Sequence, residues 1–232
     1  MKLITRTKHP TISVVVFIFF ILFMLPFGMV ILNSAKTSKE IINNAMGMPE
    51  HWGQLFKNIT TIFTNESVNY VSAFFDSASI TIFSLAVIVL FSSMCAWVLV
   101  RNDGPISRLV FMLFVMVMVI PFQVLMYPMV RWMRIMGEFL HLPLLGTMKG
   151  IVFAYLGFGC PLSIFVFHGF IKNIPYELEE AATSLGATPF YTFRKVIFPI
   201  ILPSTMAILA LNFNSLLADY DLTVFLYHPL MR

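Results

Sequence analysis

Charged side chains are scarce in this sequence of 232 residues. Only 11% of the residues are Asp, Glu, Lys or Arg, while 59% are hydrophobic. A soluble domain usually carries about 25% charged residues. A soluble domain of this length exposes most of its polar residues to water. This sequence has too few polar residues to cover such a surface, so part of its apolar surface must lie outside a buried core. The shortage of charge therefore excludes an ordinary soluble domain and predicts a protein embedded in lipid.

Cysteine is also scarce, and the common catalytic motifs are absent from the sequence. The two cysteines, Cys95 and Cys160, both fall inside apolar runs, so we interpret them as small core residues rather than a disulfide or a metal pair. The chain has no Gly-x-x-x-x-Gly-Lys-Ser/Thr, no His-Glu-x-x-His, no Gly-x-Ser-x-Gly and no Cys-x-x-Cys. The sequence therefore predicts no catalytic residues, no metal site and no cofactor.

Basic residues outnumber acidic ones, and the formal net charge is +4. In a soluble protein such a balance can indicate nucleic-acid binding. Here the basic residues lie mostly at the ends of apolar runs, where lysine and arginine anchor helices against anionic lipid. We therefore expect a lipid bilayer, and no nucleic acid, as the partner of these charges.

Long apolar runs predict about five membrane-spanning helices. A helix satisfies its own backbone hydrogen bonds in hydrocarbon, whereas an open strand does not. The expected fold class is an all-α polytopic transmembrane bundle in one domain, 1–232. Its predicted spans cover 11–32, 78–100, 107–130, 146–171 and 199–218, and we expect Pro121 and Pro128 to break the third. A signal peptide is the competing interpretation of the first run. We expect a retained span, because its roughly 22 residues can cross a bilayer and no small-residue cleavage site follows.

The charges beside the runs favour an N-terminus on the inner side. The short segment from Arg101 to Arg108 carries two arginines, and such short basic segments stay in the cytoplasm. This topology places 172–198 inside the cell. It places the polar stretch 34–77 outside, where we expect a cap of short helices.

The segment 172–198 is predicted to fold as two short helices joined by a sharp turn. Glu177, Glu179 and Glu180 stand where the first turns of a helix favour negative charge. Gly186 permits the turn. The dipeptide Thr188-Pro189 has the composition of a helix cap and first residue.

The first of these two helices carries an apolar stripe made by Leu178, Ala181, Ala182 and Leu185 at helical spacing. The small side chains of Ala181 and Ala182 would let a partner approach the backbone closely, and the three glutamates would flank that contact. We expect this face to dock into a groove on another subunit. The alternative is an ordinary amphipathic helix at the membrane interface.

The same segment resembles a known motif. Glu180-Ala181-Ala182, three residues, Gly186, nine residues and then Val196-Ile197-Phe198-Pro199 are similar to the EAA loop of ABC-importer permeases. Val196 and Phe198 are mild apolar departures. In that family the loop is the coupling helix, which sits in a cleft of the cytoplasmic ATPase. The resemblance implies that the following residues couple this chain to an ATPase: Glu177, Glu180, Ala181, Ala182, Gly186 and Pro199.

Most of the chain resembles the carbohydrate-uptake branch of these permeases, and in particular the smaller subunit of the maltose permease. The resemblance rests on Leu25-Pro26, Asn33-Ser34-Ala35-Lys36-Thr37 and Ile120-Pro121-Phe122-Gln123. It implies import of a sugar or oligosaccharide across a prokaryotic cell membrane. It also implies a second permease subunit, cytoplasmic ATP-binding subunits and an extracytoplasmic solute-binding protein as partners.

Two departures from that branch keep alternatives open. Leu185 stands where the carbohydrate branch usually has an acidic residue, which is more similar to permeases for polyamines, iron or phosphate. The family core also has a further span after the fifth, so we expect this sequence to be a truncated product. A membrane scaffold or membrane enzyme unrelated to ABC transport is the alternative from a different class.

Polar residues inside the predicted spans are candidates for a solute path. Asn212, Asn214 and Ser215 interrupt the fifth span, and Gln123 stands beside Pro121 in the third. Intramembrane polar groups face a bundle interior or a cavity, because lipid cannot pair them. They can line a path for a polyol-like solute, or they can join neighbouring helices by hydrogen bonds.

Overall fold

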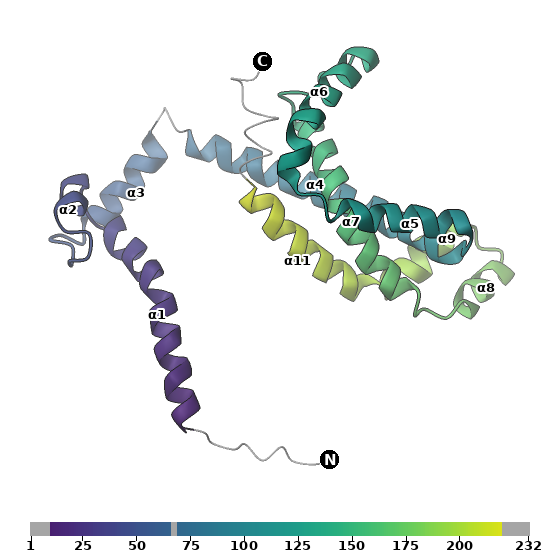
Figure 1. Cartoon of the computed structure of the whole chain (residues 1–232), viewed down its shortest axis with the longest axis horizontal. Coiled ribbons are helices and arrows are strands. Elements are labelled where there is room, and N and C mark those ends of the chain that lie inside the picture. Colours follow the sequence, from purple (N-terminus) through teal and green to yellow (C-terminus); the bar gives the residue numbers. More distant parts are fainter. Residues whose placement is uncertain (1–9, 66–68, 220–232) are drawn as a thin grey trace. The chain divides into compact units, whose positions relative to one another are not determined.

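The structure is a computed structural model that describes residues 10–65 and 69–219, without the side chains of Pro10, Phe122, Gln123 and Ala218. Within these ranges every regular element is a helix, which confirms the predicted all-α fold class (Figure 1). The chain forms two compact units, Met1–Phe74 and Phe75–Arg232, and the boundary lies inside helix α4.

Three helices of the described ranges are long and apolar enough to cross a membrane, namely Thr11–Ser34, Tyr70–Arg101 and Met148–Ile171. They correspond to the first, second and fourth predicted spans. A fourth crossing exists if the helical segments Pro189–Ile200 and Leu202–Leu217, bent by 75°, count as one broken span. The chain is therefore a multi-pass membrane protein.

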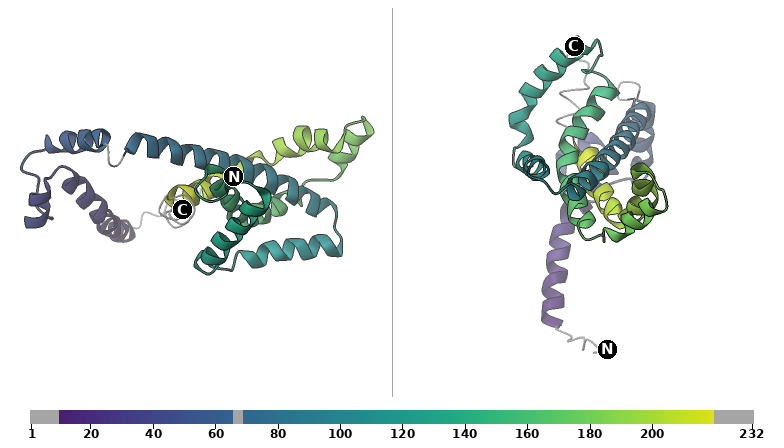
Figure 2. Two further views of the ribbon diagram at one scale, coloured as in Figure 1. Left: turned by 90° about the horizontal axis from the view of Figure 1, so that it is seen from above. Right: turned by 90° about the vertical axis from the view of Figure 1, so that its right-hand side faces the viewer.

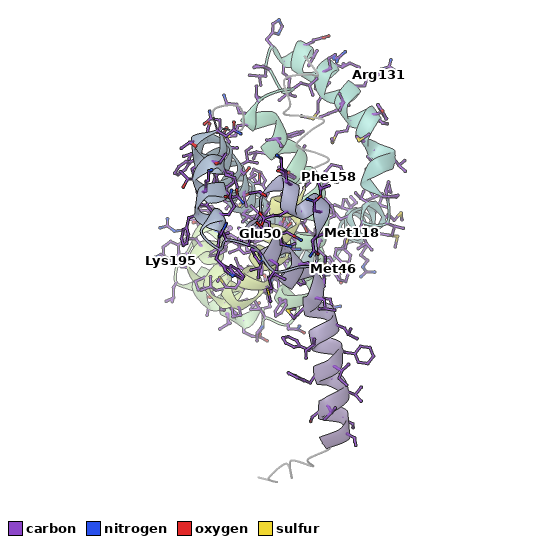
Figure 3. All side chains as sticks on the ribbon, turned by 90° about the vertical axis from the view of Figure 1, so that its left-hand side faces the viewer. Met46, Glu50, Met118, Arg131, Phe158 and Lys195 are labelled. Carbon is purple, nitrogen blue, oxygen red and sulfur yellow. The ribbon has the colours of Figure 1, made fainter. Side chains whose placement is uncertain are left out.

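The first unit contains helix α1, Pro10–Ser34, followed by two short helices, α2 at Ser38–Asn43 and α3 at Gln54–Thr64. Side chains project on all sides of α1 (Figure 3). Its residues from Thr11 to Phe27 are all exposed, and most are large and apolar. An apolar helix with no buried face suits contact with lipid.

A buried lysine ties the short helices to the end of α1. Lys36 is 3% exposed, and its Nζ donates to Asn33 Oδ1, Asn44 O and Ala45 O, each at 3.0 Å. These three acceptors compensate for the burial of the charge. The Asn58 side chain also donates to the carbonyl oxygens of Ser34 and Lys36. The segment predicted as a cap of short helices is thus held together by polar contacts.

Helix α2 begins with a capping box, in which Thr37 and Glu40 exchange hydrogen bonds between side chain and backbone. The hydrogen bond from the Thr37 backbone N–H is the main cause that lowers the pKa of Glu40 below its usual value. A carboxylate with a lowered pKa stabilises the fold above its unfolded-state pKa. This stabilisation is lost as the pH falls through the folded-state pKa.

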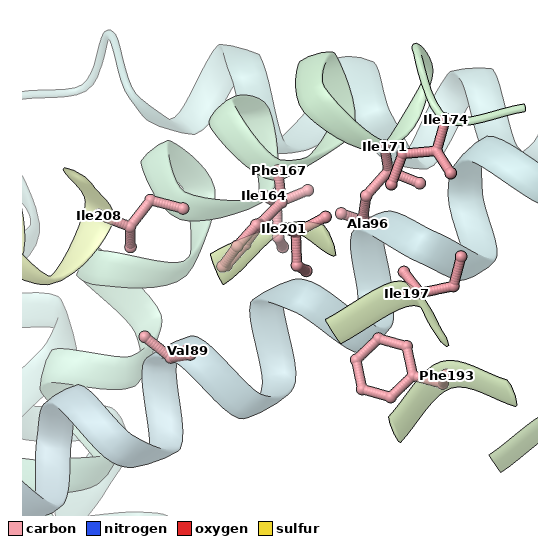
Figure 4. Packing of buried hydrophobic residues seen from close by; sticks show 10 residues of the cluster. All are labelled: Val89, Ala96, Ile164, Phe167, Ile171, Ile174, Phe193, Ile197, Ile201 and Ile208. Atoms are coloured by element: carbon pink, nitrogen blue, oxygen red, sulfur yellow. The ribbon is translucent and has the colours of Figure 1, made fainter. Parts of the chain in front are cut away.

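The second unit is built around α4, Tyr70–Arg101, and α7, Met148–Ile171. Helix α7 packs against both α5, Pro105–Val117, and α11, Leu202–Ala218 (Figure 2). The largest apolar cluster joins Ala96 of α4 to Phe167 and Ile171 of α7 and to Ile208 of α11 (Figure 4). Packing in lipid depends on such close side-chain contact, since lipid tails are as apolar as the core.

The predicted third span, 107–130, is broken at Pro121 but not at Pro128, which lies inside a helix. Helix α5 ends at Val117, and α6 covers Phe122–Leu140. The break falls at Pro121, which lacks the backbone N–H that a continuous helix needs and disfavours helical geometry at the residue before it. With 13 residues, α5 is shorter than the roughly 20 that a bilayer crossing requires.

The predicted fifth span, 199–218, begins with a bend. The short helix α10 covers Phe198–Ile200, and α11 starts at Leu202, so Ile201 lies between the two helices. Pro199 and Pro203 flank this bend. Neither proline can donate a backbone hydrogen bond to the preceding turn, so the helix axis changes direction here.

A glycine allows the start of α7 to approach the preceding turn. A methyl group at Gly150 would overlap the backbone carbonyl oxygen of Leu144. A backbone atom cannot rotate away, so we expect Gly150→Ala to destabilise the protein by about 1–3 kcal/mol. Thermal unfolding of the purified protein in detergent measures this loss. Gly157→Ala, in the same helix but with open space around the added methyl group, is the matched control and should not lower the melting temperature.

Candidate functional site in the segment 172–198

The segment 172–198, which we call the 172–198 loop, follows α7 and projects beside the end of α4 (Figure 1). It contains α8, Glu177–Ser184, and α9, Pro189–Thr192. A π-helical turn, Phe193–Ile197, then leads to α10. The two short helices and the turn between them agree with the sequence prediction.

Apolar side chains fix both ends of the loop to the bundle. Ile174, before α8, is 8% exposed, while Phe193 and Ile197, after α9, are 3% and 0% exposed. All three belong to the cluster that contains Ala96 and Ile171 (Figure 4). The π-helical turn places Phe193 and Ile197 on this buried side, and π-helical turns are frequent at functional sites. The middle of the loop projects between two anchored ends.

The bend between α8 and α9 depends on Gly186. Its backbone φ is +83°, a left-handed conformation that glycine adopts without steric cost. The N–H of Gly186 donates to Thr183 O at 2.9 Å, and the N–H of Ala187 donates to Ala182 O at 3.1 Å. These two bonds form a Schellman motif, which ends α8 and satisfies its last carbonyl groups.

The apolar stripe of α8 lies on the surface of the chain. Leu178 is 43% exposed, Leu185 is 90% exposed and Ala181 is exposed, whereas Ala182 is half-buried. The bend also encloses a groove of about 560 Å³, lined by Ala182, Leu185, Gly186, Ala187, Thr188, Tyr191 and Val196. Leu185 and the groove beside it form a candidate surface for contact with another protein.

The three glutamates of α8 do not all flank this surface, which corrects the sequence prediction. Glu177 and Glu180 are exposed, but Glu179 is 6% exposed and faces α4. Its Oε1 accepts a hydrogen bond from Arg101 Nε at 2.6 Å, and its Oε2 accepts one from Trp97 Nε1 at 3.0 Å. The sequence analysis missed this group, because its partners lie 78 and 82 positions away in the sequence.

One residue of the predicted coupling set, Pro199, lies apart from α8. Pro199 belongs to α10, on the far side of the π-helical turn, and is exposed. It contributes to the bend at Ile201 and lies outside the lining of the groove beside Gly186. The structure therefore brings Glu177, Glu180, Ala181 and Ala182 together on one short helix.

The residues predicted to line a solute path are not brought together. Asn212 is 5% exposed, and its Nδ2 donates to Ser163 Oγ of α7 at 3.1 Å and to Ile208 O at 3.0 Å. Asn214 and Ser215 are exposed on α11. The side chain of Gln123 lies outside the described residues. Asn212 makes an interhelical hydrogen bond, as the alternative interpretation expects, and a place on the solute path stays a prediction for all four residues.

Replacing Asn212 tests these two interpretations. We expect Asn212→Leu to lower the stability of the purified protein, since interhelical hydrogen bonds in membranes contribute about 0.6 kcal/mol and at most about 1.7 kcal/mol. Thermal unfolding in detergent measures the loss, and Asn214→Leu should leave the melting temperature unchanged. An altered solute preference with unchanged stability in Asn212→Leu would place this side chain on the path instead.

The described residues include no group of three or more His, Cys, Asp or Glu that could hold a metal ion. Cys95 and Cys160 are both free, and Cys160 accepts a hydrogen bond from Ser92 of α4.

Comparison with known proteins identifies similar chains. Residues 88–230 match the family described as the inner membrane component of binding-protein-dependent transport systems. A probable permease protein of a starch degradation products transport system from Thermoanaerobacterium thermosulfurigenes is 35% identical over 86% of this chain and 69% of its own length. A diacetylchitobiose uptake permease protein from Streptomyces coelicolor is 26% identical over 88% and 64%, respectively.

A third relative is a trehalose transport permease protein from Mycobacterium tuberculosis, which is 33% identical over 72% of this chain and 60% of its own length. Across these three relatives, the match covers 60% to 69% of the curated protein. The chain thus spans about two thirds of the length of proteins whose names describe sugar transport.

Proposed function

Because this chain belongs to the family of inner membrane components of binding-protein-dependent transport systems, we propose that it is a permease subunit of an ABC importer. It forms half of a transmembrane path in the cell membrane of a prokaryote. The family is a transport component, so the chain is not an enzyme. ATP hydrolysis takes place on separate cytoplasmic subunits, a second permease completes the path, and a solute-binding protein delivers the solute.

The proposed contact with the ATPase rests on one observation, the exposed face of α8. Leu185, directly after α8, is 90% exposed beside the groove at Gly186, and Glu177 and Glu180 are exposed residues of α8. An ATPase cleft that takes α8 would bury the leucine and place its basic groups near the two glutamates. Binding of ATP by the ATPase pair would then shift α8 and bias the bundle between outward-open and inward-open packing.

We infer a sugar or oligosaccharide as the solute, supported by relatives whose names describe starch degradation products, diacetylchitobiose and trehalose. Leu185, at a position that is acidic in the carbohydrate branch, supports a second candidate class of polyamine, iron or phosphate. A neutral sugar requires hydrogen-bonding side chains along its path, whereas phosphate or a polyamine requires opposite charge.

Co-purification followed by transport tests this proposal. The chain is co-expressed with the ATPase, permease and solute-binding protein encoded beside it, and the complex is reconstituted into liposomes. ATP-dependent uptake is measured with maltose, trehalose, diacetylchitobiose, spermidine and phosphate. The proposal expects co-purification of the ATPase and uptake of at least one sugar. Uptake of spermidine or phosphate alone supports the second candidate, and a chain that binds no ATPase contradicts both.

A further inference from the structure

We propose that Glu179 is a positioning residue that fixes α8 to the end of α4, so that these two helices move together when an ATPase moves α8. This inference rests on the proposed function, and it adds a route by which the movement reaches the bundle. The exposed face of α8 would receive the movement, and the opposite face would pass it to α4 through the group made by Glu179, Arg101 and Trp97.

The geometry of this group is specific. Trp97 and Arg101 are four residues apart on α4, so their side chains leave the same face of its last turns. They donate to different carboxylate oxygens of Glu179, at 3.0 Å and 2.6 Å. Because each oxygen has its own donor, the carboxylate cannot rotate without losing a hydrogen bond. Two bonds with different directions define the orientation of α8 as well as its distance from α4.

Arg101 also contacts two residues that precede α8 in the chain. One guanidinium nitrogen donates to Ile174 O at 3.2 Å, and the guanidinium carbon lies 5.6 Å from the centre of the Tyr176 ring. The indole ring of Trp97 packs on Phe193, with 5.3 Å between the ring centres. The last turn of α4 is thereby connected to residues before, within and after α8.

The buried apolar contacts of the loop lie before and after α8, at Ile174, Phe193 and Ile197. Leu178 of α8 and Leu185, which follows it, are exposed, and a cleft of about 260 Å³ opens beside the polar group that joins α8 to α4. The cleft is lined by Trp97, Arg101, Tyr176, Glu179, Pro189 and Thr192, among others. Without the hydrogen bonds, α8 could tilt into this space, so the polar group determines how α8 sits on α4.

Burial distinguishes this pair from an ordinary surface ion pair. The side chains of Arg101 and Glu179 are 16% and 8% exposed, whereas those of Arg108 and Asp103, which also form an ion pair, are both 71% exposed. Buried pairs contribute little net stability compared with apolar residues of the same size, but removing one partner leaves an uncompensated charge. A directional role in positioning explains why a charged pair is present at this contact.

The test measures how many solute molecules are transported per ATP hydrolysed by the complete reconstituted transporter. We expect Glu179→Gln, which keeps the size of the side chain, to retain the ATPase and its hydrolysis but to lower this ratio about tenfold, and Arg101→Gln to do the same. The double variant should lose no more than either single variant, since coupled residues are not additive. Misfolding would lower the amount of complex, whereas the ratio reports only on complexes that hydrolyse ATP.

Asp103→Asn is the matched control, because it removes the acidic partner of an exposed pair and should leave the ratio unchanged. A normal ratio in Glu179→Gln would overturn the inference, as would a double variant whose loss is the product of the two single losses, about a hundredfold. Failure of the unaltered chain to bind an ATPase would instead contradict the proposed function. The two failures are therefore distinguishable.

Discussion

We expect replacement of Leu185 by lysine to weaken the association of this chain with its ATPase by at least about 30-fold, the effect of losing one interface hot spot of about 2 kcal/mol. Leu185 is 90% exposed and lines the groove beside Gly186. In an ATPase cleft its side chain would be desolvated, and an ammonium group there would be buried without a partner. Co-purification at several ATPase concentrations measures the loss.

The fold itself should not be affected by this change, because Leu185 makes no part of the buried core. Thermal unfolding of Leu185→Lys should match that of the unaltered protein. Met46→Lys is the control, since Met46 is 80% exposed in the first unit, and it should retain the ATPase. If both variants bound the ATPase equally well, Leu185 would lie outside the interface.

Substitutions at Gly186 should reduce ATPase binding and transport in an order set by backbone geometry. Asparagine tolerates a left-handed conformation, alanine loses about 1–2 kcal/mol there, and proline cannot adopt the φ of +83° at all. Proline also lacks the N–H that donates to Thr183 O. We therefore expect Gly186→Asn to retain most transport, Gly186→Ala to lose about fivefold or more, and Gly186→Pro to lose it entirely.

This order distinguishes a requirement for the left-handed backbone at Gly186 from a limit on side-chain volume. A methyl group at Gly186 would meet no atom within 4 Å, so steric exclusion inside the chain would not distinguish alanine from asparagine. A series that instead followed side-chain volume, with asparagine worse than alanine, would mean that a partner covers this position closely. Full ATPase association in Gly186→Pro would favour the membrane scaffold over an importer subunit.

Much of the fold is predictable from local sequence. Apolar length gave the spans that correspond to α1, α4 and α7, and the dipeptide Thr188-Pro189 predicted the start of α9 correctly, with the Thr188 hydroxyl accepting from the N–H of Tyr191. These features depend on residues near one another in the chain. The break at Pro121 was also predictable, because proline cannot continue a helix, whereas the expected break at Pro128 is absent, since that proline lies inside α6.

The features that were missed depend on distant contacts. Helical spacing placed Leu178 and Leu185 on an apolar face of α8 and treated the three glutamates alike. Only the packed bundle shows that Glu179 faces Arg101. Likewise, the partner of Asn212 is Ser163, 49 positions away. Local pattern gives the periodicity of a helix, whereas the neighbouring elements decide which face is buried.

The most direct test of the account places a photoreactive amino acid at position 185 in cells that make the complete transporter. Irradiation should join this chain to its cytoplasmic ATPase, and the same probe at position 46 should not produce that adduct. An adduct with the ATPase from position 185 would support contact through the exposed face of α8. Efficient cross-linking from position 185 to extracytoplasmic proteins, with no ATPase adduct, would contradict it.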